Sequence, residues 1–266
     1  MSVSYPNAPL VELVAELQWP TQTSALFNGG VPVGVPIFAD TSATEGFYTR
    51  FAERVEALGF RHSERLSPAG SFVPPGQAVY RFRQQVNQPP LYQVGDGLFT
   101  ANGLPPTYSA WDDFSPILQQ GIEAALASRT EPEASADFSS LSLRYINAFD
   151  ASFWRGKTAA HFSSEVLGFS LKLPERVEDA RAAEQSPSLN IQAVVPLQDG
   201  GSISFQLGEG VVDGRNVVIL DMTLRYVNIP INAAHDRFNT AHEFAHNVFE
   251  DLTAEVHDVL EAKVSA

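Results

Sequence analysis

The residues whose types and spacing most suggest chemistry are His242-Glu243-Phe244-Ala245-His246, near the end of the chain. They match the H-E-x-x-H pattern of zinc metallopeptidases. In that pattern two histidines one helical turn apart bind zinc, and the glutamate between them activates a water molecule. A zinc-dependent hydrolase that uses His242 and His246 as ligands and Glu243 as base is therefore one hypothesis for this chain.

Helical periodicity argues against that hypothesis. The apolar residues around the motif recur at spacings of three and four, which places His242 at the margin of the inward face, His246 farther round and Glu243 toward solvent. Zinc needs a third protein ligand, and the nearby candidates all lie on the same predicted helix: Glu250, His257 and Glu261. We therefore interpret the motif as a chance match and expect no metal, no cofactor and no catalytic residue.

A second group of polar candidates lies on predicted strands. Asp221 and Arg225 point to the same face of one strand, and they could pair with each other or with Arg144 and Asp150 on a neighbouring strand. On an exposed face these side chains would form a surface ion-pair network. In a cradle between two halves of the chain, Arg144, Asp221 and Arg225 would instead hold a small polar ligand. We favour the surface network and keep the cradle as an alternative.

A third candidate is the apolar loop over residues 20–45, which is rich in glycine and proline. Long irregular segments in compact domains are often functional, so Val33, Val35 and Ile37 are candidate contacts with a partner protein. The alternative is that the loop packs over a sheet edge and buries these side chains against the protein itself.

The elements that must position these residues follow from hydrophobic periodicity. The pattern predicts an α+β fold in which antiparallel sheets carry long helices packed on one face. Strands are predicted over residues 10–19, 61–66, 77–85, 91–101, 141–149, 189–197, 202–207 and 217–227. Helices are predicted over residues 46–58, 107–129, 153–168 and 233–264. Gly59 occupies the position expected of a helix C-cap.

This order of elements repeats. Each half reads strand, helix, three strands and long helix, and a polar, acidic run over residues 130–137 separates the two copies. The sequence therefore predicts a pseudo-duplication with halves 1–133 and 134–266 that together form one compact unit. An insert over residues 174–188 is expected to be a solvated loop or a short surface helix.

Composition excludes several classes of function. The net charge of −14 and pI near 4.7 argue against a broad surface for nucleic acid or anionic membranes. No stretch approaches the roughly 18 consecutive apolar residues that a membrane helix requires, and the N-terminus lacks the pattern of a signal peptide. The chain has no cysteine, which rules out disulfides and thiolate chemistry. We expect a cytoplasmic protein.

Several motifs together resemble a sporadically distributed bacterial protein family of unknown function, and the resemblance covers nearly the whole chain. The motifs are Tyr5-Pro6-Asn7-Ala8-Pro9-Leu10-Val11-Glu12, Gln93-Val94-Gly95 with Asn102, Tyr108, Trp111 and Phe114, Leu143-Arg144-Tyr145-Ile146-Asn147, and Ala241-His242-Glu243 with Phe249 and Thr253. The resemblance implies a bacterial cytoplasmic protein of patchy distribution, as is common among accessory or defence-associated genes.

These observations favour a non-enzymatic interaction protein that belongs to a bacterial multi-protein system. We expect a protein partner and keep an oligomer open. The small-molecule cradle and the zinc hydrolase remain the two alternatives.

Overall fold

A computed structural model describes residues 5–21, 27–28, 31–32, 42–68, 71, 73–180 and 188–262. Its strands are β1 Leu10–Gln18, β2 Phe27–Asn28, β3 Val31–Pro32, β4 His62–Arg65, β5 Ala78–Arg83, β6 Leu91–Gly95, β7 Leu98–Gly103, β8 Phe138–Phe149, β9 Asn190–Pro196, β10 Ser202–Val212 and β11 Arg215–Ile229. Its α-helices are α1 Ser42–Ala57, α2 Trp111–Ser128, α3 Ala159–His161, α4 Glu175–Ala180, α5 Ala234–Thr253 and α6 His257–Glu261. Among the described helices, none is both long and apolar enough to cross a membrane.

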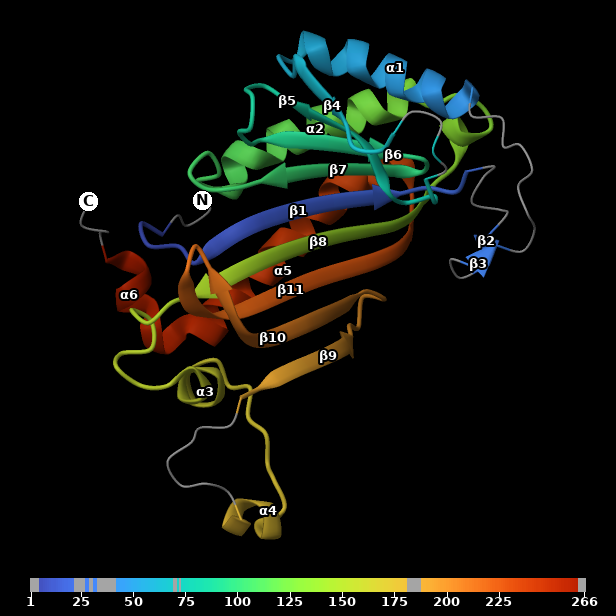
Figure 1. Ribbon diagram of the computed structural model, residues 1–266. Coiled ribbons are helices and arrows are strands. Elements are labelled where there is room, and N and C mark those ends of the chain that lie inside the picture. Colours follow the sequence, from blue (N-terminus) through green and yellow to red (C-terminus); the bar gives the residue numbers. More distant parts are fainter. Residues whose placement is uncertain are drawn as a thin grey trace. The chain divides into compact units, whose positions relative to one another are not determined.

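The main feature of the fold is one antiparallel sheet of nine described strands (Figure 1). The sequence predicted the mixture of helices with antiparallel strands, but it predicted more than one sheet. Its strand order is β4-β5-β6-β7-β1-β8-β11-β10-β9, and β2 and β3 form a separate two-stranded ribbon. By contact density the chain divides into two compact units. The first unit contains Glu12–Leu143 and Arg225–Ala241, and the second contains Val3–Val11, Arg144–Leu224 and His242–Ala266.

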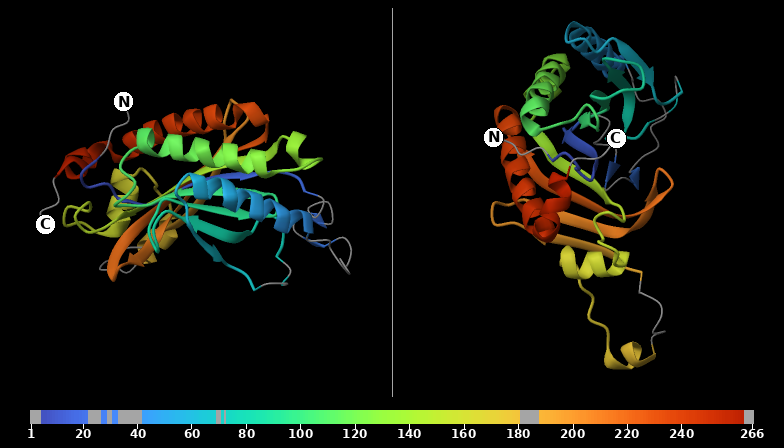
Figure 2. Two further views of the ribbon diagram at one scale, coloured as in Figure 1. Left: turned by 90° about the horizontal axis from the view of Figure 1, so that it is seen from above. Right: turned by 90° about the vertical axis from the view of Figure 1, so that its left-hand side faces the viewer.

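In the first unit, helices α1 and α2 pack beside each other and contact the strands through α1–β5 and α2–β7 (Figures 1 and 2). A close approach requires a residue without a side chain at Gly121 of α2. A Cβ atom there would lie 2.6 Å from Phe99 and 2.7 Å from Tyr92, both fully buried. Helix α1 ends as predicted, since Gly59 adopts the left-handed φ of 93° that favours glycine.

The second unit has its own hydrophobic core, to which β10 and β11 contribute side chains. Buried aromatic and aliphatic side chains come from the end of β8, from the segment after it, from both strands and from the C-terminal helices. The fully or nearly fully buried members are Phe149, Phe153, Phe162, Leu167, Leu207, Val218, Leu220, Val256 and Leu260. Ile191 of β9 and Phe205 of β10 pack against this cluster, so one face of β9 is anchored to the core.

The connection after α2 is held by a buried arginine. Arg129 is only 5% exposed, and its guanidinium lies over the rings of Trp19 and Phe138 at 5.1 and 5.4 Å. It donates hydrogen bonds to the carbonyls of Glu133 and Ala136. Burial lowers the pKa of Arg129, and nearby carboxylates oppose that shift. The polar run expected to be a linker is therefore an ordered connection that contains the 3-10 helix Glu133–Ser135.

Three predicted elements are wrong in detail. The single strand predicted over 91–101 is a hairpin, β6 and β7, which turns at Gly97 with φ of 67°. The first half therefore has four strands after its helix, not three. The helix predicted over 153–168 is reduced to α3 and the π-helix Phe162–Val166. The long C-terminal helix is broken by the 3-10 helix Ala254–Val256 into α5 and α6.

Candidate functional site

The H-E-x-x-H residues lie on α5 in the second unit. His242 and His246 stack one turn apart, with nearly parallel rings (16°) and centroids 6.0 Å apart. Glu243 is exposed, as the periodicity predicted. Across the described residues, no group of three or more histidine, aspartate or glutamate side chains is placed to hold a metal ion.

Both histidines face protein partners. The Nδ1 atom of His242 and the hydroxyl of Tyr145 on β8 share a hydrogen bond of 2.7 Å. The Nδ1 atom of His246 lies 3.8 Å from a carboxylate oxygen of Glu250, one turn further along α5. The geometry is that of a polar row along one flank of the helix, in which each imidazole faces a side chain of the protein.

The polar row ends in a cluster of Glu250, His257 and Glu261, which the sequence analysis considered as further zinc ligands, and of Tyr5, which it did not connect with them. His257 lies between two carboxylates, with Nε2 3.6 Å from Glu250 and Nδ1 3.6 Å from Glu261. The hydroxyl of Tyr5 donates to Glu250 and lies 3.3 Å from Nε2 of His257. Burial raises the pKa of Tyr5, and the hydrogen bond and charge of Glu250 raise it further, so this phenol remains a donor.

The N-terminal motif Tyr5-Pro6-Asn7 thereby holds the C-terminal helices. The backbone and side-chain nitrogens of Asn7 donate to the carbonyls of Leu260 and Val259, each at 3.1 Å. These carbonyls belong to the last turn of α6, where a helix leaves carbonyls without α-helical partners; the carbonyl of Val259 also accepts from the backbone of Ala262 at 3.3 Å. A side chain separated by about 250 residues could not be paired with them from sequence. The only signal was that the Tyr-Pro-Asn motif belongs to the resemblance described above. The arrangement fastens the N-terminal segment to the last turn of α6.

The strand residues Arg144 and Asp221 form a two-point ion pair. The Nε atom of Arg144 donates to Oδ1 of Asp221 at 2.9 Å, and Nη2 donates to Oδ2 at 2.5 Å. Asp221 is buried and Arg144 is about half exposed. Asp150 pairs with Arg215 at 2.9 Å, and Arg225 is exposed. This arrangement agrees with the ion-pair network, because the guanidinium of Arg144 is engaged by a carboxylate of the protein itself.

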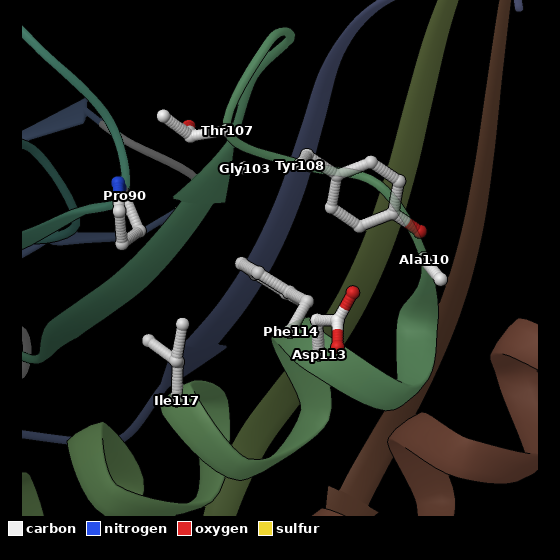
Figure 3. A pocket seen from close by; sticks show the side chains of 8 residues that line it. All are labelled: Pro90, Gly103, Thr107, Tyr108, Ala110, Asp113, Phe114 and Ile117. Carbon is white, nitrogen blue, oxygen red and sulfur yellow. The ribbon is translucent and has the colours of Figure 1, made fainter. Parts of the chain in front are cut away.

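Two hollows in the first unit are too small for a metabolite. The one in Figure 3 has about 40 Å³ of space for water-sized molecules, which is enough for a few waters. It lies where β7 leads into α2, and Tyr108, Phe114 and Ile117 line it together with Pro90 and Thr107. A second hollow beside Arg129 has about 20 Å³.

The loop candidates Val33, Val35 and Ile37 lie outside the described residues, so their role stays a prediction. A candidate interaction feature among the described residues is strand β9, Asn-Ile-Gln-Ala-Val-Val-Pro. It pairs with β10 on one side, and within the described part of the chain no strand pairs with its other edge. Val194 is 63% exposed and Val195 is 45% exposed.

The opposite edge strand, β4, has a different composition. It is four residues long and reads His-Ser-Glu-Arg. Its Glu64 lies 2.9 Å from Arg83 and 3.6 Å from Arg81 on β5, and its Arg65 pairs with Glu45 at 2.9 Å. Short length and charged side chains are the usual devices that keep a sheet edge from pairing with another chain. Strand β9 has neither device.

Sequence reasoning could not find β9 as a candidate, because the edge position of a strand depends on the order of the whole sheet. A comparison of the chain with protein-family models, with curated proteins and with solved structures gave no match. The function proposed below therefore depends on the geometry of the described residues and on the resemblance of the sequence motifs.

Proposed function

We propose that this chain is a non-enzymatic interaction protein of a bacterial multi-protein system, and that it acts through the free edge of β9. The observation that carries the proposal is the combination of an edge that no described strand pairs with, seven residues without a charge and two adjacent exposed valines. An edge of this kind is a template for a further strand.

The physical basis is strand addition. Every second residue of an edge strand directs its N–H and C=O groups outward, where an added strand replaces water as their partner. Each such hydrogen bond contributes about 0.5–1.5 kcal/mol net. Specificity comes from the side chains, since Val194 and Val195 lose water-exposed apolar surface when they are covered.

The two alternative functions have less support from the described geometry. A small-molecule cradle would need Arg144 to leave Asp221, which holds it at two points. A zinc hydrolase would need Glu243 to face a metal that His242 and His246 share, whereas Glu243 is exposed. Neither arrangement has a specific observation in its favour.

We further infer that the chain arose by duplication of one half. The strand order supports this inference, because outward from the centre it reads β1, β7, β6, β5, β4 on one side and β8, β11, β10, β9 on the other. The two halves then correspond strand by strand: β1 to β8, β7 to β11, β6 to β10 and β5 to β9. In the first half, β4 pairs with the outer edge of β5. The position that β4 fills in the first half has no described strand in the second. Superposition of residues 8–129 on 139–262 in an experimental structure should match the long helices and at least three strands in the same order.

The function is tested by selective loss of binding. Tagged wild-type chain, Val194→Lys and Val86→Lys are used to capture proteins from one bacterial lysate that also contains the untagged chain. The captured proteins, untagged copies of the chain included, are quantified by mass spectrometry. Val86 is the matched control, because it is 62% exposed and lies in the turn between β5 and β6. The proposal predicts proteins that wild type and Val86→Lys retain equally and that Val194→Lys loses about tenfold or more. Equal capture by all three chains would overturn it.

A further inference from the structure

We propose that the strand that adds to β9 comes from a second copy of the same chain, so that two β9 strands pair antiparallel about a two-fold axis. This inference rests on the proposed function and names the partner of that same edge. A closed two-fold arrangement uses the same surface on both copies, so one free edge is sufficient.

The charge of the edge favours a second copy. The chain has 31 acidic and 17 basic residues, yet β9 and the part of β10 that pairs with it, Ser202 to Gly208, contain none of either. Two identical acidic chains can therefore meet along this edge without opposing like charges at the contact. A basic or acidic partner strand would find no complementary charge there.

The order of side chains on β9 is also compatible with self-pairing. Full overlap of Asn190–Pro196 with itself places the two-fold axis at Ala193. Ile191 of one copy then lies beside Val195 of the other on the face that packs toward the core. On the exposed face, Val194 lies beside Gln192 of the other copy. Pairs of β-branched side chains across neighbouring strands are favourable, and both valines become covered.

The surroundings of β9 leave the edge accessible to a second copy in the described part of the chain. Strand β10 occupies only one side of β9. Helix α4 precedes β9 in the chain and stands away from β9 and β10 in two views (Figure 1 and the right view of Figure 2). The turn that follows β9 is held by its own hydrogen bond, from the backbone of Gly201 to Asp199.

Self-association is measured by sedimentation velocity at protein concentrations from about 1 to 200 µM, a range suited to a small interface. Wild type and Val86→Lys should shift from monomer to dimer as concentration rises, and Val194→Lys should weaken the dimer about tenfold or more. Raising salt from about 0.05 to 0.5 M should strengthen the dimer, because salt screens repulsion between two acidic chains. A dimer that Val194→Lys leaves intact would overturn the inference.

The register is tested by cysteine cross-linking, since the chain has no cysteine of its own. Ala193→Cys places two thiols opposite each other at the two-fold axis, within the Cα separation of about 4.4–6.8 Å that a disulfide spans. Val195→Cys places its two thiols four residues apart along the strands. Oxidation should cross-link the first variant and leave the second monomeric on a denaturing gel. Equal cross-linking of both variants would overturn the register centred on Ala193.

The two proposals fail in different ways. A chain that stays monomeric at every concentration and forms no cross-link through Ala193→Cys overturns the second-copy inference alone, provided that Val194→Lys still loses captured proteins. If all three chains capture the same proteins in equal amounts, untagged copies of the chain included, the proposed function is overturned as well.

Discussion

The two edge strands of the sheet, β4 and β9, each pair with a well-buried neighbouring strand, but they differ in the residues that discourage pairing with a further strand. Each lies beside a strand with a deeply buried side chain, Phe82 on β5 next to β4 and Leu207 on β10 next to β9. What differs is the outer edge, because β4 has Glu64 and Arg65 in ion pairs and β9 has exposed Val194. The comparison teaches that the sheet can support a strand at both ends. Strand β4 has charged residues that discourage a further strand, whereas β9 has only the proline at its end, Pro196.

The first prediction concerns the stability of the unit that carries β4. Tyr48 and Tyr92 are buried there, and burial is the main cause that raises the pKa of both phenols. A raised pKa means that the folded state favours the protonated phenol. The stability from this preference is present below the ordinary pKa of about 10 and is lost as pH rises above it, by about 1.4 kcal/mol per pH unit for each phenol.

Urea unfolding between about pH 9 and 11.5 checks this expectation. The free energy of unfolding of wild type should fall steeply above pH 10. For Tyr92→Phe the slope should be smaller by the contribution of one phenol, about 1.4 kcal/mol per pH unit. The second unit has the partly buried Tyr5, whose pKa is raised by burial and by Glu250. Identical slopes for wild type and Tyr92→Phe would show that Tyr92 titrates as it does in the unfolded chain.

The second prediction separates the two devices that protect β4, its charge and its short length. Glu64→Val removes the carboxylate that pairs with Arg81 and Arg83 and gives the strand an apolar, β-branched residue. We expect a loss of less than about 1 kcal/mol of stability, because Glu64 is half exposed. In the double variant Glu64→Val, Val194→Lys, the β9 edge is blocked and only the β4 edge can associate. Sedimentation should give a monomer at concentrations where wild type is a dimer, since the four residues of β4 direct too few backbone groups outward. Association as strong as that of wild type would mean that charge alone protects β4.

The sequence predicted most of the helices and strands in this comparison, but it did not predict which strands lie at the two ends of the sheet. The helical patterns located α1, α2 and α5, and Gly59 ended α1 as expected. The hairpin at Gly97 was missed because its two strands are short and nearly all their residues are buried, so no alternation of apolar and polar residues separates them. Without that turn the first half has one strand too few, and the different ends of the sheet cannot be recognised.

The candidate site divides in the same way. The pairing of Arg144 with Asp221 was among the alternatives, because alternation along strands places side chains on one face. The contacts of Tyr5 with Glu250 and His257 were not, since they join the two ends of the chain. Local periodicity contains no information about such distant pairs.

The most direct test of the account is amide hydrogen exchange of β9 and β4, followed in one sample of wild-type chain at low and at high protein concentration. The account predicts that the outward amides of β9 exchange rapidly in dilute protein and slow down on concentration, because a second strand covers them. The amides of β4 should exchange at the same rate in both conditions. Exchange of β9 that is independent of concentration, or equal slowing of β4, would contradict the claim that β9 is the edge through which this protein associates.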